Sequence, residues 1–507
     1  MKKRFTMWGL VTMLSLLVMA LVGCGNDAGK GGTKTVRLGG TSAVTASIDP
    51  AKDWEGWYTV RFGVAETLFK LDKTLSPVPW LATKGEQVNG TTWKITLNDK
   101  AVFSNGTKVT PEKVIASLKR AGEKNSRAKV LKEANYSVEG NSIIVQTKEP
   151  QASFIHDLTD PYAAIIDVEG TKDFDKSPIG TGPFVVTSFE PNKKAVLAKN
   201  AKYWDGAVKS EQVEFVNIAD FNTLALAAQN GEVDIALAMS PQSAESAAKS
   251  DKLTVVKTVQ PRAYILYFHM EKMTDKAVRE AIVYGVDKKT IGDKQLKGAV
   301  TPANGAFLDN SDYGAKNLKV REYNEAKAKE VLAAAGYKDT DQDGIVEKDG
   351  KPLVIKLSIY KRLAMESIAT EMQAQLKKIG IKVEIDVHEK ASYMTPGNFE
   401  VALYSMITTP TGDPYASLYD IMGTGRASNF GRYSSPVVDG YLADMSNNFN
   451  AAERIILAEK IQQVALDDAA YAFIGFNNMH TAISKSISGY ETSANDYYQM
   501  TKDVVKK

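Results

Sequence analysis

Two spacings of apolar residues alternate along this chain and predict a mixed α/β protein. Residues 91–97 alternate between polar and apolar side chains, as a half-buried strand requires. Apolar residues recur at helical spacing over 60–71 and again over 364–379, and both stretches are therefore predicted to be helices. Strands and helices that alternate in this way are typical of domains in which helices cover a sheet.

Capping residues indicate where several of the predicted helices begin or end. Thr110 followed by Pro111 is the pattern of a helix start, because proline fits the first helical turn and needs no hydrogen-bond acceptor there. Gly231 is placed to end the helix predicted over 220–230. Dense β-prone runs at 264–269 and 472–476 predict two further strands. These last two are far apart in the sequence.

The N-terminus has the pattern of an export signal. Lys2, Lys3 and Arg4 precede an apolar stretch over 7–22. Gly23 and Cys24 follow this stretch directly. The stretch is short for a membrane span and fits a signal peptide, residues 1–23, in front of a bacterial lipobox. We therefore expect Cys24 to carry a diacylglycerol and further acyl chains, with residues 24–33 as a flexible tether.

Composition narrows the classes of function. Cys24 is the only cysteine, which excludes disulfides within the chain and any zinc or iron–sulfur site built from cysteines. The 63 basic and 60 acidic residues leave a net charge of +3 over 507 residues, so a nucleic-acid partner is not expected. No P-loop, nucleophile elbow or His-Glu-x-x-His pattern occurs, and the chain is not predicted to be an enzyme.

Several local strings, in order along nearly the whole mature chain, carry a resemblance to a known family. They are 66–72 (ETLFKLD), 79–82 (PWLA), 102–107 (VFSNGT), 178–184 (PIGTGPF), 200–204 (NAKYW), 231–234 (GEVD), 278–282 (VREAI), 412–414 (GDP) and 433–439 (YSSPVVD). Together they resemble the oligopeptide-, dipeptide- and nickel-binding proteins of bacterial ABC importers, solute-binding protein family 5.

The resemblance implies an α/β, two-lobed clamp of the class II periplasmic-binding-protein type, with mixed sheets and a hinge of two crossing strands. The predicted strands at 264–269 and 472–476 are candidates for the crossings. The implied domains are lobe I (34–266, with an inserted subdomain at about 83–175), lobe II (267–477) and a C-terminal return to lobe I (478–507).

The same resemblance implies a monomer without a cofactor that binds one ligand by lobe closure. Its partners would be an ABC permease and ATPase, and its place the outer face of the cell membrane of a Gram-positive-type bacterium, held by its lipid. The ligand would be a short peptide or a chelate of nickel or another transition metal. A surface receptor or adhesin with this fold is the alternative, and a secreted hydrolase is a weaker one.

Two segments supply candidate ligand-binding residues near the first strand and the first crossing. Aromatic rings in the loop after the first strand either stack on a ligand or pack the lobe, and an acid there would pair with an amine or cation. An arginine near the hinge would bind a carboxylate, or else lie on a strand edge. These candidates are Trp54, Glu55, Trp57 and Tyr58 in the loop, and Arg262, Tyr264 and Tyr267 at the crossing.

A third candidate segment is the loop at 408–415. In peptide-binding relatives, an aspartate just upstream of the Asp-Pro pair holds the peptide amine, whereas this chain has Pro410 there. Asp413 either contributes to the site or only shapes the Gly-Asp-Pro turn. The remaining candidates are Thr409 in this loop and Arg426, Asn429 and Arg432 in the glycine-containing loop that follows.

The sequence does not predict a metal cage built by the protein alone. The four histidines are widely spaced, and only His269 and His480, which lie near the crossings, are candidates to assist a metal chelate. Asp339, Asp341 and Asp343 imitate the start of an EF-hand calcium loop, but its twelfth position is Gly350. We interpret this stretch as a polar hairpin turn.

Overall fold

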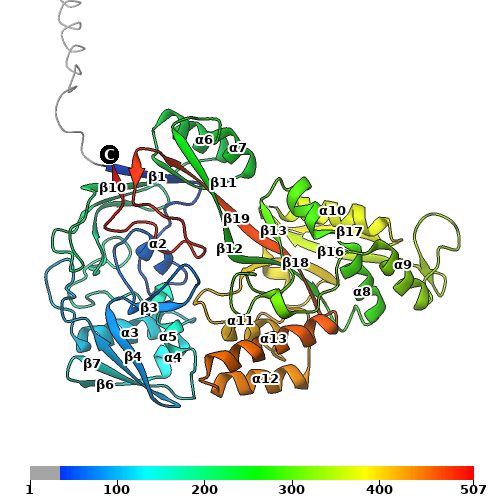
Figure 1. The fold of residues 1–507 in the computed structure, drawn as a ribbon, viewed down its shortest axis with the longest axis horizontal. Helices are drawn as coiled ribbons and strands as arrows, with labels where there is room; N and C mark the ends of the chain where they lie inside the picture. The colour runs from blue at the N-terminus through cyan, green and yellow to red at the C-terminus, as the bar shows by residue number, and fades with distance from the viewer. Residues whose placement is uncertain (1–34, 363) are drawn as a thin grey trace, which may run out of the picture.

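The computed structural model describes residues 35–362 and 364–507, which form two lobes joined by two long strands (Figure 1). The predicted signal peptide, lipidation site and tether lie outside the described residues. The joining strands are β12 (Leu253–Phe268) and β19 (Tyr471–Ser484), which pair antiparallel along most of their length. The predicted crossings are the second-lobe ends of these strands, so the hinge of two crossing strands is confirmed.

A single mixed sheet continues through both lobes because β12 and β19 belong to both halves. Its order is β17-β16-β18-β12-β19-β11-β1-β10-β9-β8, and β13 (Val300–Pro302) also pairs with β19. The first lobe contributes β1 (Thr35–Gly40), β8 (Phe184–Glu190), β9 (Lys194–Lys199), β10 (Gln212–Asn217) and β11 (Ile235–Met239). The second contributes β16 (Val354–Tyr360), β17 (Lys382–His388) and β18 (Val401–Ile407).

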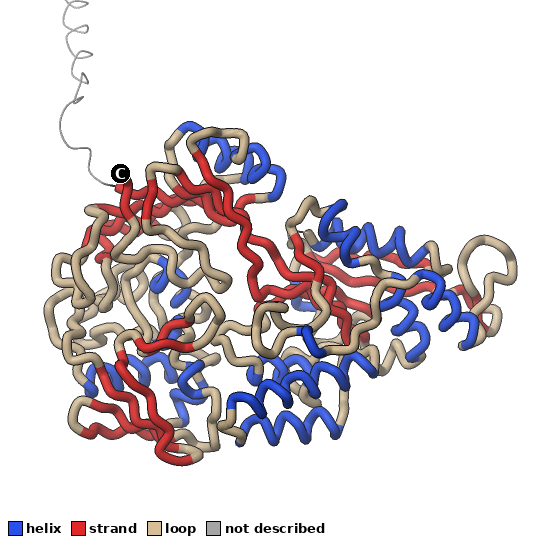
Figure 2. Tube along the Cα trace, viewed as in Figure 1, coloured by secondary structure: helices blue, strands red, loops and turns tan. Residues whose placement is uncertain are grey.

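Helices flank this sheet and bury its faces (Figure 2). The first lobe has α2 (Gly56–Arg61), α6 (Phe221–Asn230) and α7 (Pro241–Ala247). The second has α8 (Lys276–Gly285), α9 (Glu325–Ala334), α10 (Met365–Lys377), α11 (Tyr415–Met422), α12 (Pro436–Asn447) and α13 (Ala451–Asp467). The prediction for α10 is confirmed, and Gly231 ends α6 in the left-handed conformation, with φ of +76°.

The helix predicted over 60–71 is wrong. Helix α2 ends at Arg61, and Gly63 turns the chain with φ of +67°. Residues 69–71 instead form β2 (Phe69–Leu71), which pairs with β3 (Pro77–Pro79). The apolar residues that suggested a helix, Val64, Leu68 and Leu71, are nevertheless buried, because this irregular stretch crosses the core of the first lobe.

A small subdomain with its own core lies at one end of the first lobe. Its sheet has the order β4 (Ala82–Asn89), β5 (Thr92–Leu97), β7 (Ser142–Gln146) and β6 (Asn135–Glu139). Helices α3 (Pro111–Lys124), α4 (Lys129–Glu133) and α5 (Phe154–Asp157) complete it. Thr110 caps α3 by accepting a hydrogen bond from the Lys113 amide, as predicted. The predicted insertion at 83–175 includes most of these elements, and its bounds remain a prediction.

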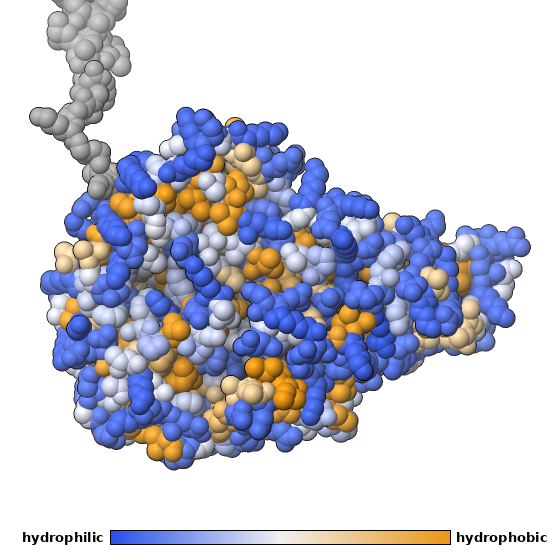
Figure 3. Space-filling model, viewed as in Figure 1, coloured by the Kyte–Doolittle hydropathy of each residue, from blue (hydrophilic) through white to orange (hydrophobic). Residues whose placement is uncertain are grey.

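After β19 the chain returns across the first lobe, drawn in red in Figure 1. The return is anchored by a hydrogen bond from Ser210 Oγ to the Val504 carbonyl (2.7 Å) and by the pair β20 (Ile487–Ser488) and β21 (Val505–Lys506). A small hairpin of β14 (Glu347–Lys348) and β15 (Lys351–Pro352) projects from the second lobe. Apolar residues show only in scattered groups on the face in Figure 3. Within the described residues, no helix is long and apolar enough to span a bilayer.

Candidate functional site at the junction of the lobes

The lobes touch at the loop at 408–415, here called the junction loop, and also where Phe449 of the second lobe packs on Trp93 of the subdomain, with ring centroids 6.3 Å apart. The Tyr497 hydroxyl donates a hydrogen bond to the Pro410 carbonyl across the junction (2.8 Å). Nδ1 of His156, in the subdomain, lies 2.9 Å from the Thr411 carbonyl oxygen. Gly412 packs so tightly on the first lobe that a Cβ atom there would lie 1.9 Å from the Leu75 carbonyl oxygen. The structure is therefore a closed form of the clamp.

Arg262 lies where β12 passes from one lobe to the other. The register between β12 and β19 shifts between Val259 and Ala263, which takes the intervening residues out of the regular ladder. Such irregularities re-aim side chains, often at functional sites. The junction loop is attached at the same point, because Thr408 N donates to the Pro261 carbonyl (2.8 Å).

The Arg262 guanidinium is a positive charge without a carboxylate partner among the described residues. Burial lowers its pKa to about 10, and the nearby positive charge of Arg362 adds to this effect. Asp496 acts in the opposite direction but is itself paired with Arg61, with Nη2 and Oδ1 2.5 Å apart. Arg262 is only half-buried, but a charge that is partly removed from water and has no full partner is still costly, so this arrangement favours an anion at the junction.

The first lobe adds aromatic rings and hydrogen-bond donors to the junction. Trp57 packs against Tyr497, with ring centroids 5.7 Å apart, and Arg61 lies over the Trp57 ring at 5.2 Å. Trp57 Nε1 and Asn495 Nδ2 are buried and have no hydrogen-bond partner among the described atoms. Both donors would be available to an acceptor that a ligand brings.

The junction site is thus rich in donors and poor in free acids. Asp496, as described, is paired with Arg61, and its backbone adopts a rare positive φ of +51°. Such backbone strain is concentrated at functional sites. Chemically, the arrangement can hold a ligand that accepts hydrogen bonds or carries negative charge. The carboxylate near Arg262, that of Asp496, is already bound to Arg61 and is not free for a ligand ammonium group.

Three predicted site residues make contacts inside the second lobe. The Asp413 carboxylate binds Arg454, with 2.5 Å between Oδ2 and Nη2, and accepts from the Tyr415 amide (2.7 Å). Asn429 is buried and bonds only to protein groups, including the Tyr433 carbonyl and amide. Tyr267 is buried, and its hydroxyl lies 3.6 Å from Met406 Sδ.

Five others lie around or away from the junction. Trp54 is 52% exposed and stacks on Arg127, whose Cζ lies 3.6 Å from the ring centroid. Burial raises the pKa of the Glu55 carboxyl, and the Tyr58 hydroxyl donates to the Ser42 carbonyl (3.3 Å). Arg426 stacks on Tyr419 at 3.9 Å, and Arg432 pairs with Glu271 at 2.7 Å on the surface.

The remaining candidates are also distributed over both lobes. Tyr264 is buried on β12, two residues beyond Arg262, and its hydroxyl lies 3.4 Å from Asn477 Oδ1. Thr409 is buried at the base of the junction loop. Burial lowers the pKa of both His269, which lies beside Phe399 in the second lobe, and His480, on the first-lobe part of β19. The structure does not bring the two histidines together.

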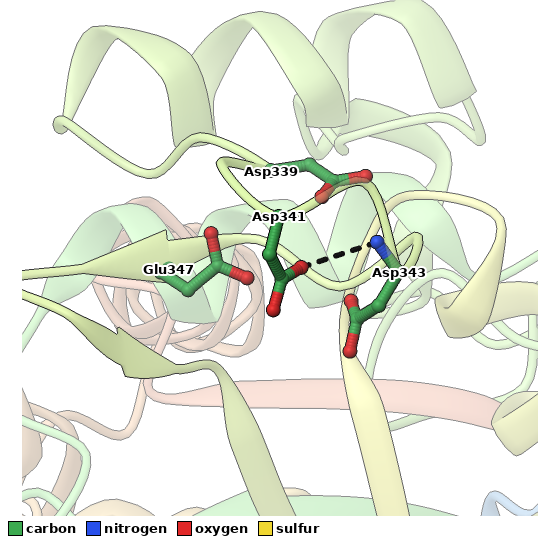
Figure 4. Close-up of side chains that lie close together, drawn as sticks. All are labelled: Asp339, Asp341, Asp343 and Glu347. Atoms are coloured by element: carbon green, nitrogen blue, oxygen red, sulfur yellow. Dashed lines mark hydrogen bonds between the residues drawn. The ribbon is translucent and has the colours of Figure 1, made fainter.

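The acidic loop forms a compact turn (Figure 4). Ligand oxygens of Asp339, Asp341, Asp343 and Glu347 lie within 4.8 Å of one another, and the first three residues are exposed. The carboxylates accept hydrogen bonds from the loop itself, for example Asp339 Oδ2 from Gly344 N (3.0 Å) and Glu347 Oε2 from Thr340 N (2.7 Å). Lys338 pairs antiparallel with Glu347, as in the hairpin predicted from the sequence.

A cavity of about 550 Å³ lies elsewhere, under the returning C-terminal segment of the first lobe. Glu66, Trp80, Tyr203 and Tyr498 are among its lining residues, and none of the predicted site residues is. Since only one lobe lines it, closure of the clamp does not form this cavity. We therefore assign the candidate site to the junction.

Sequence reasoning missed much of the junction site. Arg61, Arg362, Asn495, Asp496 and Tyr497 were not predicted, although the C-terminal return was. The signal for the last three is the polar and aromatic run at 490–499, which is unusual for a terminal segment. No comparable signal marked Arg362, which the fold alone brings near Arg262.

The fold and the junction together define a two-lobed solute-binding clamp. The model of the bacterial extracellular solute-binding proteins, family 5, matches residues 76–429. The chain therefore belongs to this family, whose members act as substrate-binding proteins of ABC importers.

The relatives bind two kinds of ligand. The nickel-binding protein NikA of Staphylococcus aureus is 27% identical over 95% of this chain and 96% of its own length. Its crystal structure in complex with Ni(L-His)2 has a TM-score of 0.77 at 25% identity, covering 94% of this chain and all of that one. The oligopeptide-binding protein AppA of Bacillus subtilis is 25% identical over 97% of both chains.

Proposed function

We propose that the chain captures a small metal chelate whose ligands carry carboxylates, such as a nickel–histidine complex, and delivers it to an ABC permease and ATPase. The observation that supports this most is the unpaired Arg262 at the hinge. Guanidinium groups bind carboxylates strongly and in fixed geometry. Closure of the lobes would exclude water and strengthen these contacts.

The choice between chelate and peptide rests on the pairing of the two aspartates that lie closest to Arg262 and in the junction loop. A free peptide carries an N-terminal ammonium group, which a binding site usually pairs with a carboxylate. At this junction Asp496 and Asp413 are already paired with Arg61 and Arg454. In a chelate, the amine is bound to the metal and needs no such partner, whereas its carboxylates need donors.

The experiment is a binding measurement by isothermal titration calorimetry on the chain from residue 25 onward. The probes are Ni²⁺ alone, L-histidine alone, Ni²⁺ with L-histidine, and a set of short peptides. We expect the mixed nickel–histidine probe to bind with a Kd at least tenfold lower than either component. Tight binding of peptides with no binding of the nickel–histidine complex would make this a peptide-binding protein instead.

We also propose that the protein is a lipoprotein on the outer face of the cell membrane, anchored through Cys24. The basis is the apolar stretch that ends at this cysteine, together with the extracellular family. Expression of Cys24→Ser in a Gram-positive host should abolish labelling by a palmitate analogue, while the wild-type chain is labelled. A labelled Cys24→Ser protein would refute the assignment.

A further inference from the structure

The junction loop is held by side chains that bind its main chain. The Pro410 carbonyl accepts from Tyr497 and the Thr411 carbonyl from His156. The next carbonyl, of Gly412, accepts from the Tyr313 hydroxyl of its own lobe. Three successive carbonyls are thus bound by three rings, two of which belong to the opposite lobe. None of these contacts requires a ligand, because all six groups belong to the protein.

The loop is stiff where it meets the first lobe. Asp413 is tied to Arg454 and to the Tyr415 amide, and Arg454 also donates to the Met445 carbonyl (2.5 Å). Gly412 has φ of +78° and leaves no space for a side chain against Leu75. Because a stiff loop fits closely against the first lobe, the lobes are either fully closed on it or apart, and partial closures are not favoured.

An acid lies beside this contact. Asp157 follows His156 in α5, and its Oδ2 accepts from Gln151 Nε2 (2.8 Å) and faces Ser153 Oγ at 3.5 Å. Burial raises the pKa of the Asp157 carboxyl to about 7, and the negative charge of Asp413 on the opposite lobe contributes.

The other charged groups around Asp157 are largely neutralised. Asp160 raises the Asp157 pKa further but is paired with Arg127. Tyr162 also faces Asp157, and its pKa lies well above its ordinary value because of burial, so it stays neutral. A proton on His156 would not break the latch, because its Nδ1 already needs a hydrogen to donate to a carbonyl.

We propose that His156, Asp157 and the junction loop form a proton-coupled latch, which holds the lobes shut without touching the ligand and closes more readily when Asp157 is protonated. The inference rests on the proposed capture by lobe closure. When the loop withdraws, the negative charge of Asp413 moves away from Asp157, so the Asp157 pKa falls from about 7 toward its ordinary value of about 3.9. Closure therefore takes up a proton between about pH 4 and pH 7, and the closed form loses this support as the pH rises through 7.

The test uses the ligand-free protein, so its outcome does not depend on which ligand binds. Cysteines introduced at Lys129 on α4 and Asp444 on α12, both exposed, carry a fluorescent donor and acceptor in the chain from residue 25 onward. We expect the closed, high-transfer fraction to fall at least fivefold from pH 5 to pH 8. In Asp157→Asn, which mimics the protonated acid, it should change less than twofold. Equal pH dependence in both proteins, or none in the wild type, would overturn the proposal.

A second pair of variants tests the contact itself. Gly412→Ala should remain in the low-transfer state at every pH, because its Cβ would collide with Leu75 of the other lobe. Gly425→Ala is the matched control, since Gly425 also has a positive φ, +68°, but no heavy atom within 4 Å of the added Cβ. It should behave like the wild type. Circular dichroism must show both variants folded, and a closing Gly412→Ala protein would contradict the latch.

Discussion

The Asp413 carboxylate and the Arg454 guanidinium form a buried ion pair, with 2.5 Å between Oδ2 and Nη2 and exposed fractions of 5% and 8%. The pair sets the shape of the junction loop from inside the second lobe. Asp413 was predicted from the sequence to contact a ligand, but in the structure its carboxylate binds Arg454. Its carboxylate anchors the loop that the first lobe grips.

Removal of one partner of this pair should be strongly destabilising. Asp413→Ala leaves the Arg454 guanidinium buried without its counter-charge, and we expect a loss of about 3–5 kcal/mol in the free energy of unfolding. Urea denaturation followed by circular dichroism measures it. The matched control is Glu271→Ala, which breaks the exposed pair with Arg432 and should cost less than about 1 kcal/mol. Similar losses in the two variants would argue against the role assigned to Asp413.

Replacement of Arg262 should weaken ligand binding without lowering the stability of the ligand-free protein. Arg262→Gln removes a half-buried charge that has no carboxylate partner among the described residues, so the ligand-free protein should be as stable as the wild type or more stable. If Arg262 binds a ligand carboxylate, affinity for the nickel–histidine probe should fall by about 2–3 kcal/mol, the value of a charged hydrogen bond. Calorimetry and thermal unfolding on the same samples give both quantities. A less stable variant with unchanged affinity would make Arg262 a structural residue.

The two unpartnered tryptophan N–H groups provide another comparison. Trp57 packs on Tyr497 at the junction, whereas Trp93 lies in the subdomain core, where Phe449 of the second lobe packs on its ring and a phenylalanine would keep that aromatic contact. Both have a buried Nε1 without a partner among the described atoms. Trp57→Phe should weaken ligand binding by about 1 kcal/mol, through loss of one neutral hydrogen bond. Trp93→Phe should leave the affinity unchanged. The same titration serves both variants, and a weaker affinity only in Trp93→Phe would be inconsistent with the site described.

Glu66 should make the stability of the protein depend on pH. Its oxygens accept hydrogen bonds from the Tyr203 hydroxyl (2.6 Å) and Trp204 Nε1 (2.8 Å), but burial dominates and raises its pKa to about 7. Because the pKa is raised in the folded state, the contribution of protonated Glu66 to the free energy of unfolding is complete below the unfolded pKa of about 4.3. It is lost as the pH rises through 7. At about 1.4 kcal/mol per pKa unit, the loss is about 4 kcal/mol.

The neutral variant Glu66→Gln should lose this part of the pH dependence. An amide can still accept from Trp204 and donate to the Tyr203 oxygen, so the hydrogen bonds are kept. Urea unfolding at pH 5 and pH 8 should differ less for this variant than for the wild type. Glu169→Gln, which changes an exposed acid with an 84% exposed side chain, is the control and should follow the wild type. Wild-type behaviour in Glu66→Gln would rule out the buried acid as the source.

The sequence alone determined the family, the α/β class and many local elements. Thr110 with Pro111 predicted the start of α3, and the β-prone runs at 264–269 and 472–476 predicted the hinge strands, because capping and alternation act over a few residues. The same local rules failed at 60–71. There the apolar spacing suits a helix, but Gly63 and the surrounding core leave the chain extended.

Only the tertiary structure decided which residues form the site. Asp413 looks like a ligand contact until Arg454, 41 residues away, is found against it. Arg262 becomes notable only because no described carboxylate pairs with it, since Asp496 is bound to Arg61. The interaction between His156 and Thr411 joins residues 255 positions apart. Burial and charge pairing depend on what the fold brings together, and no local pattern in the sequence records that.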